Sequence, residues 1–285
     1  MSSSARRALR ILESVGSAAK PVGVSEVARA LILSPGTVFR SLDALGKAGL
    51  VGRYQASARY VLGPAAERLR QSLLACFPIR EVCLPYLRQL ASLSGETTSL
   101  HVRLGWYGVR IASSPGTGEV TNSPPLGEAH PLADSYAGEA ILAFMSQADI
   151  AHYRVWAAKH GLRWGEKERA LSTIAARGFA TGEGPFQAGV PVALPVRGDC
   201  TALAAFAIEG PVFHPDARVS AMSDWAEIAG HVEALARAQP QLFENPFAHL
   251  DPDSIALGDL PEPGLATRPS GAAAAGPDWK APSRA

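Results

Sequence analysis

Residues 24–51 read VSEVARALILSPGTVFRSLDALGKAGLV and decide how the first third of the chain folds. The pair Ser34-Pro35 favours the start of a helix, because serine caps free amides and proline fits the first helical turn. Gly49 marks the end of this helix, so we predict it over residues 35–47. Its apolar residues recur at helical spacing and form one face: Val38, Leu42 and Leu45.

Two further helices are predicted before this one. Residues 6–16 place apolar side chains at helical spacing, and Ser25 can cap a short helix over residues 26–30. The tight turn between the last two helices is typical of a helix-turn-helix, whose second helix enters the DNA major groove. We therefore predict DNA contacts from the polar face of that helix: Ser34, Thr37, Arg40 and Ser41. An ordinary helical hairpin with an exposed arginine is the alternative at this point.

The residues that follow favour the DNA-binding interpretation. Two short strands are predicted over residues 50–54 and 59–63, on either side of a turn. With the three helices, this hairpin would complete a winged helix-turn-helix over residues 1–63. Arg53 and Arg59 lie on the predicted wing, where we expect them to contact phosphate or the minor groove.

The charge of the chain is divided unevenly. Residues 1–80 contain twelve lysines and arginines but only four acidic residues, a balance of +8. Because the whole chain carries +1, the remainder carries −7. A basic first third indicates a module that binds a polyanion such as double-stranded operator DNA. A chance excess of solvated arginines would give the same balance, so the charge supports DNA binding without deciding it.

Other features of the sequence exclude several classes of protein. No apolar run approaches the ~18 residues of a membrane span, and the N-terminus lacks the apolar core of a signal peptide. The three cysteines form no CxxC pair, so we expect a protein of the reducing cytoplasm. The sequence contains no GxSxG, HExxH or GxxxxGKS/T motif, and its seven histidines are scattered. We therefore expect no enzyme, no metal and no cofactor.

The chain from residue 64 onward is predicted to mix helices and strands. We interpret residues 64–78 as a linker helix and residues 79–243 as a second domain. Its expected helices cover 79–93, 134 or 135 to 145, 146–160, 167–177 and 219–238, and its expected strands cover 97–104, 109–113, 190–196 and 202–208. Residues 113–131 are predicted as loop. Residues 244–285, rich in Pro, Gly and Ala, are predicted as a disordered tail.

Taken in order along the chain, these stretches resemble the IclR family of bacterial regulators. Besides residues 24–51, the resemblance rests on ARYVLGP (58–64), PLADSYAGEAILAF (131–144), ARGFA (176–180), GVPVALPV (189–196) and AAFAIEGP (204–211). It covers residues 6 to about 238. It implies an α+β fold class, with an N-terminal winged helix-turn-helix and a C-terminal GAF-like α/β domain that binds a small-molecule effector. It also implies a homodimer or homotetramer.

The resemblance places the effector between the N-terminus of the helix at 134–145 and two strands of the second domain. The expected lining is Ser135, Ala137, Gly138, Val192, Ala207 and Glu209. Two strand positions that usually offer hydroxyl groups in the family are Ala207 and Glu209 here. If Arg110 or Arg197 neutralises Glu209, the helix amides are free for an organic acid. Otherwise Glu209 favours a ligand with an amine or hydroxyl donor, which is the alternative we prefer.

Two functional interpretations stay open from the sequence. The first is a DNA-binding regulator controlled by a small-molecule metabolite. The second is a DNA-binding regulator whose C-terminal domain only oligomerises or binds a protein partner, and a solvent-facing Glu209 would favour it. Either protein is expected to pair, because one winged helix reads one operator half-site. The amphipathic helices at 6–15 and 79–93 are the predicted pairing surfaces.

Overall fold

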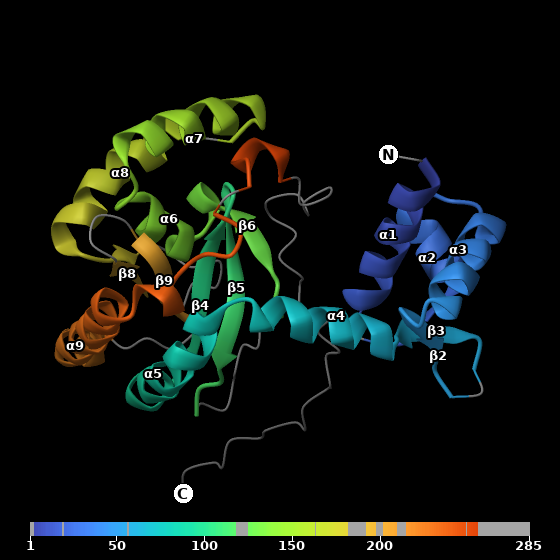
Figure 1. Cartoon of the computed structure of the whole chain (residues 1–285), viewed down its shortest axis with the longest axis horizontal. Helices are drawn as coiled ribbons and strands as arrows, with labels where there is room; N and C mark the ends of the chain where they lie inside the picture. The colour runs from blue at the N-terminus through green and yellow to red at the C-terminus, as the bar shows by residue number, and fades with distance from the viewer. Residues whose placement is uncertain are drawn as a thin grey trace, which may run out of the picture.

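A computed structural model describes the chain over residues 3–18, 20–55, 57–117, 125–162, 164–181, 192–197, 202–209, 215–248 and 250–255. Figure 1 shows a small helical part near the N-terminus and a larger part built around a sheet, connected by one helix. The small part contains α1 (Ser3–Gly16), α2 (Val24–Leu31), α3 (Pro35–Lys47), β1 (Val22–Gly23), β2 (Val51–Arg53) and β3 (Arg59–Leu62). The predicted helix-turn-helix and its wing are therefore confirmed.

The start of α2 differs from the prediction. Gly23, not Ser25, is the capping residue, and the carboxylate of Glu26 accepts a hydrogen bond from the Gly23 amide at 3.0 Å. The reason is a strand that the sequence did not reveal. Val22 and Gly23 pair with Tyr60 and Arg59 of β3, so the wing is a three-stranded sheet in the order β1-β3-β2.

The helix α4 (Pro64–Ala75) leads out of the wing, as the expected linker helix. Its first turn is tied to the end of α3, because the amide of Gly63 donates to Leu50 O at 2.8 Å and that of Ala65 donates to Gly49 O at 3.0 Å. The helix α5 (Pro78–Ser94) follows after a short break at Phe77.

The larger part is built on a six-stranded sheet in the order β6-β5-β4-β9-β8-β7, with all neighbouring strands antiparallel. Its strands are β4 (Thr97–Leu104), β5 (Tyr107–Ser114), β6 (Ala129–Pro131), β7 (Ala180–Thr181), β8 (Val192–Arg197) and β9 (Ala202–Glu209). One expectation was wrong here: residues 113–131 are not all loop, since β6 pairs with β5 and forms an edge of the sheet. The expected combination of a winged helix-turn-helix and an α/β domain is confirmed.

Helices cover both faces of this sheet (Figure 1). The helices α5 and α9 (Pro215–Ala238) pack on one face, with Leu100, Phe206 and Trp225 in the shared core. On the other face lie α6 (Tyr136–Leu142), α7 (Gln147–Lys159) and α8 (Trp164–Arg177). Alternation along β9 separates the two cores, since Phe206 belongs to the first and Ala207 to the second.

The chain does not become a tail at residue 244, contrary to the prediction. Short 3-10 turns at Pro240–Leu242 and Pro252–Ser254 (η2 and η3) follow α9, and the chain between them packs on the domain. Phe243 is buried in the α5–α9 core. The richness in Pro, Gly and Ala suggested disorder, but a few aromatic and hydrogen-bonding side chains are enough to hold residues 244–248 and 250–255. Residues 256–285 lie outside the described part of the chain.

Among the described residues, no helix is long and apolar enough to span a membrane. In the same residues, no three His, Cys, Asp or Glu side chains gather as they would around a metal ion.

Candidate DNA-binding surface and ligand corner

The N-terminus of α3 is capped by Ser34, as predicted. Its hydroxyl accepts a hydrogen bond from the Thr37 amide at 3.3 Å and lies 2.8 Å from the Thr37 hydroxyl. Both side chains stand at the start of α3, where a helix in the major groove presents residues to base edges. Their mutual hydrogen bond, in which either hydroxyl can be the donor, holds the two side chains together in the absence of DNA.

The rest of α3 separates a buried face from an open one. Val38 and Leu42 are completely buried in the small core, while Arg40 is exposed and Ser41 is half-buried. Phe39, beside Arg40, is 48% exposed. The arrangement puts a guanidinium, a hydroxyl and an aromatic ring on the outside of the second helix of the motif.

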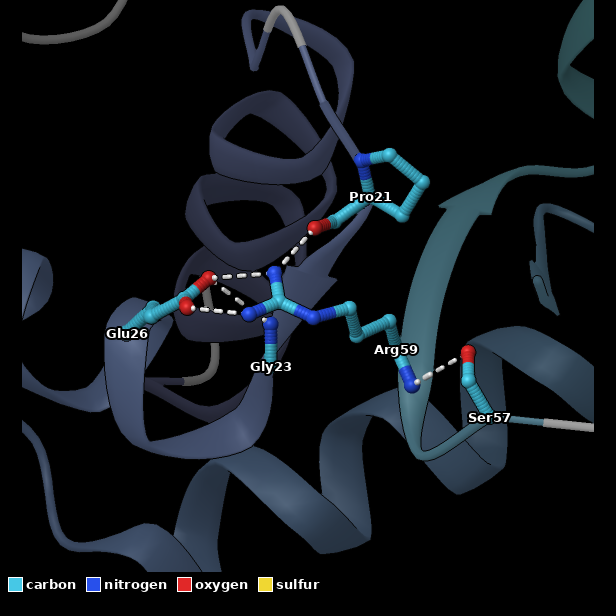
Figure 2. A network of polar contacts seen from close by, with 5 residues as sticks. All are labelled: Pro21, Gly23, Glu26, Ser57 and Arg59. Atoms are coloured by element: carbon cyan, nitrogen blue, oxygen red, sulfur yellow. Dashed lines mark hydrogen bonds and ion pairs between the residues drawn. The ribbon is translucent and has the colours of Figure 1, made fainter.

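The two wing arginines have different surroundings. Arg53 is exposed at the end of β2. The guanidinium of Arg59, shown in Figure 2, donates to both carboxylate oxygens of Glu26, at 2.9 and 3.3 Å, and to Pro21 O at 2.6 Å. These contacts bind the base of the wing to the start of α2. Of the two wing arginines, Arg53 is therefore the better candidate for a DNA contact.

The Glu26 carboxylate is stabilised in its ionised form. The hydrogen bond from the Gly23 amide, followed by the hydrogen bond and charge of Arg59, lowers the pKa of Glu26 below its ordinary value of 4.5. A lowered folded-state pKa means that this contribution to stability is present above pH 4.5. It is lost as the pH falls through the folded pKa, because protonation breaks the contacts with Gly23 and Arg59.

We therefore expect the amide of Gly23 to lose hydrogen-exchange protection when the pH is lowered from 6 through the folded pKa of Glu26. The measurement is amide exchange, corrected for the intrinsic pH dependence. A Glu26→Gln variant is the control, and its Gly23 protection should not change over the same pH range. Equal pH profiles in the two proteins would contradict this account of the wing.

A second group of predicted residues, Ser135, Ala137 and Gly138, lies at the start of α6, and we call this place the ligand corner. Ser135 caps this helix, and its hydroxyl accepts from the Gly138 amide at 3.1 Å. Ala137 is buried, and a Cβ added to Gly138 would lie 2.1 Å from Leu132 O. Gly138 is thus required for the close approach of α6 to the preceding turn. One of the helix amides is already occupied by Ser135, which leaves fewer of them for a ligand.

The sheet face beneath α6 carries buried polar side chains that sequence reasoning missed. Ala207 and Ala205 of β9 are buried and pair with Ser99 and His101 of β4. Ser99 Oγ lies 2.9 Å from His101 Nε2, and both side chains are buried. The sequence did carry a signal, because Ser99, His101 and Arg103 occupy alternate positions of β4. Only the pairing of β4 with β9 shows that Ser99 and His101 lie beneath α6.

The acidic residues near this corner are largely paired. Glu128 forms an ion pair with the buried Arg110, and His130 Nε2 lies 3.3 Å from its other oxygen. The His130 hydrogen bond, followed by Arg110, lowers the pKa of Glu128, while burial raises the pKa of Asp134. Glu139 is buried and forms an ion pair with Lys167. The charges of Glu128 and Glu139 are thus balanced by Arg110 and Lys167.

Two predicted lining residues are described only by their backbones. Val192 of β8 pairs with Ile208, and Glu209 at the end of β9 pairs with Thr97. Their side chains lie outside the described part of the structure. The backbone places Ala207 and Glu209 on the same side of β9, because alternate residues of a strand share a face.

Comparison with known proteins agrees with this arrangement. Residues 4–53 match the IclR helix-turn-helix domain, and residues 71–238, more than half of the chain, match the bacterial transcriptional regulator IclR C-terminal domain. The chain belongs to the IclR family. Members of this family are DNA-binding transcriptional regulators, not enzymes.

Curated relatives support the same assignment. The regulator BhcR of Paracoccus denitrificans is 30% identical in an alignment of 239 residues that covers 76% of this chain and 81% of that protein. The glycerol operon regulatory protein of Streptomyces griseus is 30% identical in an alignment of 222 residues that covers 73% of this chain and 85% of that protein.

Solved structures share the fold of this IclR-family chain. The IclR protein of Thermotoga maritima superposes with a TM-score of 0.63 at 21% identity, over 84% of this chain and 98% of that one. An IclR homologue of Microbacterium hydrocarbonoxydans, solved with 4-hydroxybenzoate, gives a TM-score of 0.64 at 19% identity, over 83% of this chain and all of that one. At these identities the likeness concerns the fold alone.

Proposed function

We propose that this IclR-family protein binds an operator through α3 and the wing, and that a small polar molecule bound beneath α6 controls this binding. The observation that carries the proposal is the exposed face of α3, where Arg40 and the linked hydroxyls of Ser34 and Thr37 stand opposite a fully buried apolar face. Ser41 and Arg53 extend this surface. Because its target is chromosomal DNA, the protein acts in the cytoplasm.

The decisive experiment is a genome-wide footprint with the purified full-length protein. Fragments of the source genome that bind the protein should cluster at a few discrete sites with a shared, two-fold symmetric sequence. Recovery of fragments from all regions in equal proportion would contradict a specific operator. The genes beside the sites would identify the pathway from which the effector comes.

We propose that the effector carries hydroxyl or amine donors. Arg110 and Arg197 were the two candidates to neutralise Glu209, and each holds another carboxylate. Arg110 pairs with Glu128, while Arg197 Nε donates to Glu233 Oε1 at 2.7 Å. Each guanidinium therefore already balances the charge of one carboxylate, and we propose that Glu209 also accepts a hydrogen bond from the effector. The proposed lining is Ser135, Ala137, Gly138, Val192, Ala207 and Glu209.

Thermal unfolding with matched compounds tests this ligand class. We expect 4-hydroxybenzoate or benzylamine to stabilise the protein more than benzoate, because benzoate lacks the donor that Glu209 would receive. A ligand of the folded state adds about 2.7 kcal/mol at a hundredfold excess over its Kd. The Glu209→Ser variant should change the order of the compounds. Identical responses of the two proteins would place Glu209 outside the site.

A broad metabolite screen by the same method addresses the second interpretation. If no compound stabilises the protein while the footprint shows discrete sites, the C-terminal domain acts only in assembly or in binding a protein partner.

We also propose that the protein pairs, through a surface that differs from those expected from the sequence. The faces of α1 and α5 that carry Ile11 and Leu87 are buried within their own cores, which leaves only Leu9 and Leu93, among the described large apolar side chains of these helices, exposed to a second copy. The linker helix α4 instead exposes Leu69 and Leu73, which are 62% and 49% exposed and lie one turn apart.

Light scattering at micromolar concentration should therefore report a dimer or tetramer. The double variant Leu69→Glu/Leu73→Glu should shift the protein toward the monomer, with a dissociation constant more than about tenfold higher, since each buried leucine contributes roughly 1.5–3 kcal/mol. Val155→Glu is the matched control, because Val155 is 55% exposed on α7, away from the linker. A monomeric wild-type protein would contradict the proposal.

A further inference from the structure

The chain beyond the family domain packs against the larger part of the molecule. The match to the IclR C-terminal domain ends at residue 238. Residues 240–248 and 250–255, which we call the C-terminal strap, continue after α9 and run toward the turn between β4 and β5 (Figure 1). Its contacts fall into two groups, one with the region where α4 and α5 meet and one with the β4–β5 turn.

The first group fixes the strap to the end of the linker. Phe243 is 3% exposed within the α5–α9 core. The ring of Phe247 lies 5.6 Å from that of Phe77, centroid to centroid. Phe77 is 5% exposed and occupies the break between α4 and α5, so the strap touches the point at which the linker helix joins the domain.

The second group fixes the strap to the β4–β5 turn. Asn245 Nδ2 donates to Arg103 O at 2.5 Å, and Trp106 Nε1 donates to Asp253 Oδ1 at 2.6 Å. Gly105 between them has φ +58°, and a Cβ there would lie 3.1 Å from Pro252 O. The turn therefore uses glycine both for its left-handed backbone and for the close approach of the strap.

The β4–β5 turn also contacts the residues that precede α6. Trp106 is 1% exposed and makes an edge-to-face contact with Tyr153, with ring centroids 5.6 Å apart. The Tyr153 hydroxyl accepts from the Ala133 amide at 2.8 Å, and Trp106 O accepts from the Leu132 amide at 3.0 Å. Leu132 and Ala133 form the turn that leads into α6.

We propose that the C-terminal strap couples the turn before α6 to the start of the effector domain at Phe77, and through α4 to the DNA-binding part. A chain of packed rings and hydrogen bonds joins the two ends, which is the kind of contact that transmits a change between distant sites. The coupling rests on the proposed function only in that a ligand is assigned to the start of α6 and DNA to α3 and the wing.

The test removes the contact of the strap with the β4–β5 turn and measures hydrogen exchange at the start of α5. Asp253→Ala in the full chain removes the bond to Trp106 and should accelerate hydrogen exchange of the Phe77 and Arg80 amides about fivefold, which corresponds to the loss of one hydrogen bond. These amides donate to Leu74 O and Phe77 O. Glu244→Ala is the matched control, because Glu244 is an exposed acid of the same strap without a hydrogen bond or ion pair among the described residues.

The reciprocal variant is Phe247→Ala, with exchange of the Leu132 amide as the readout, because coupling between two sites acts equally in both directions. Faster exchange at the far end in both variants supports the proposal. Changes confined to the mutated end, or equal changes in Glu244→Ala, overturn it. Neither DNA nor a ligand enters these measurements, so the strap can fail while the proposed function stands, and the reverse.

Discussion

Replacing Arg40 with alanine is expected to weaken operator binding by about 1–3 kcal/mol, a roughly five- to 150-fold rise in Kd. Arg40 is exposed on the open face of α3, and a guanidinium there can donate two hydrogen bonds to a guanine edge. Its side chain is not part of the small core, so the loss should appear in binding and not in folding. Gel-shift titration at one fixed salt concentration, with an operator found by footprinting, measures the effect.

Arg169→Ala is the matched control for this prediction. Arg169 is an exposed arginine of α8, and its removal changes the net charge by the same amount. It should leave operator affinity unchanged. Equal affinity of Arg40→Ala and the wild type would remove Arg40 from the DNA interface. If Arg40 contacts a phosphate instead of a base, the variant should weaken binding to all sequences alike and lower the salt dependence by about one counterion.

Gly138→Ala is expected to destabilise the protein by about 3 kcal/mol or more, the largest effect on folding that we predict. The added methyl group would lie 2.1 Å from Leu132 O and 2.6 Å from Leu132 Cα. Both are backbone atoms, which cannot rotate away as the end of a side chain can. The turn before α6 would have to shift, together with the Ser135 cap.

Gly230→Ala is the control, because the same substitution there should not lower the free energy of unfolding. Gly230 lies inside α9 with no atom within 4 Å of an added Cβ, and alanine is the better helix former. Gly230→Ala should therefore be neutral or stabilise the fold by up to about 1 kcal/mol. Denaturant unfolding measures both variants, and a Gly138→Ala midpoint equal to that of the wild type would show that the turn adapts at no cost.

Local signals were sufficient for much of the fold. The Ser34-Pro35 start of α3, the apolar spacing of Val38, Leu42 and Leu45, and the two wing strands all appear in the structure where the sequence places them. These elements are encoded by neighbouring residues, through capping, proline geometry and periodicity. Apolar periodicity placed most of the remaining helices and strands in the same way, but not the short strands β1, β6 and β7.

Long-range pairing decided what local signals could not. Glu26 and Arg59 are 33 residues apart, and only the pairing of β1 with β3 brings them together. The same holds for the alanines of β9 and the polar residues of β4. The sequence does not distinguish an arginine that is exposed from one that forms an ion pair, because strand register determines the partner.

The sequence by itself determined the class of this protein: a DNA-reading helix, a basic first third and a family of regulators. The tertiary structure decided which side chains are free to act. Arg59 forms an ion pair with Glu26, and Glu128 and Glu139 form ion pairs with nearby cations. The chain after residue 240 contacts Phe77 and Trp106. Helix periodicity is set over a few residues, whereas burial and ion pairing depend on residues that only folding brings into contact.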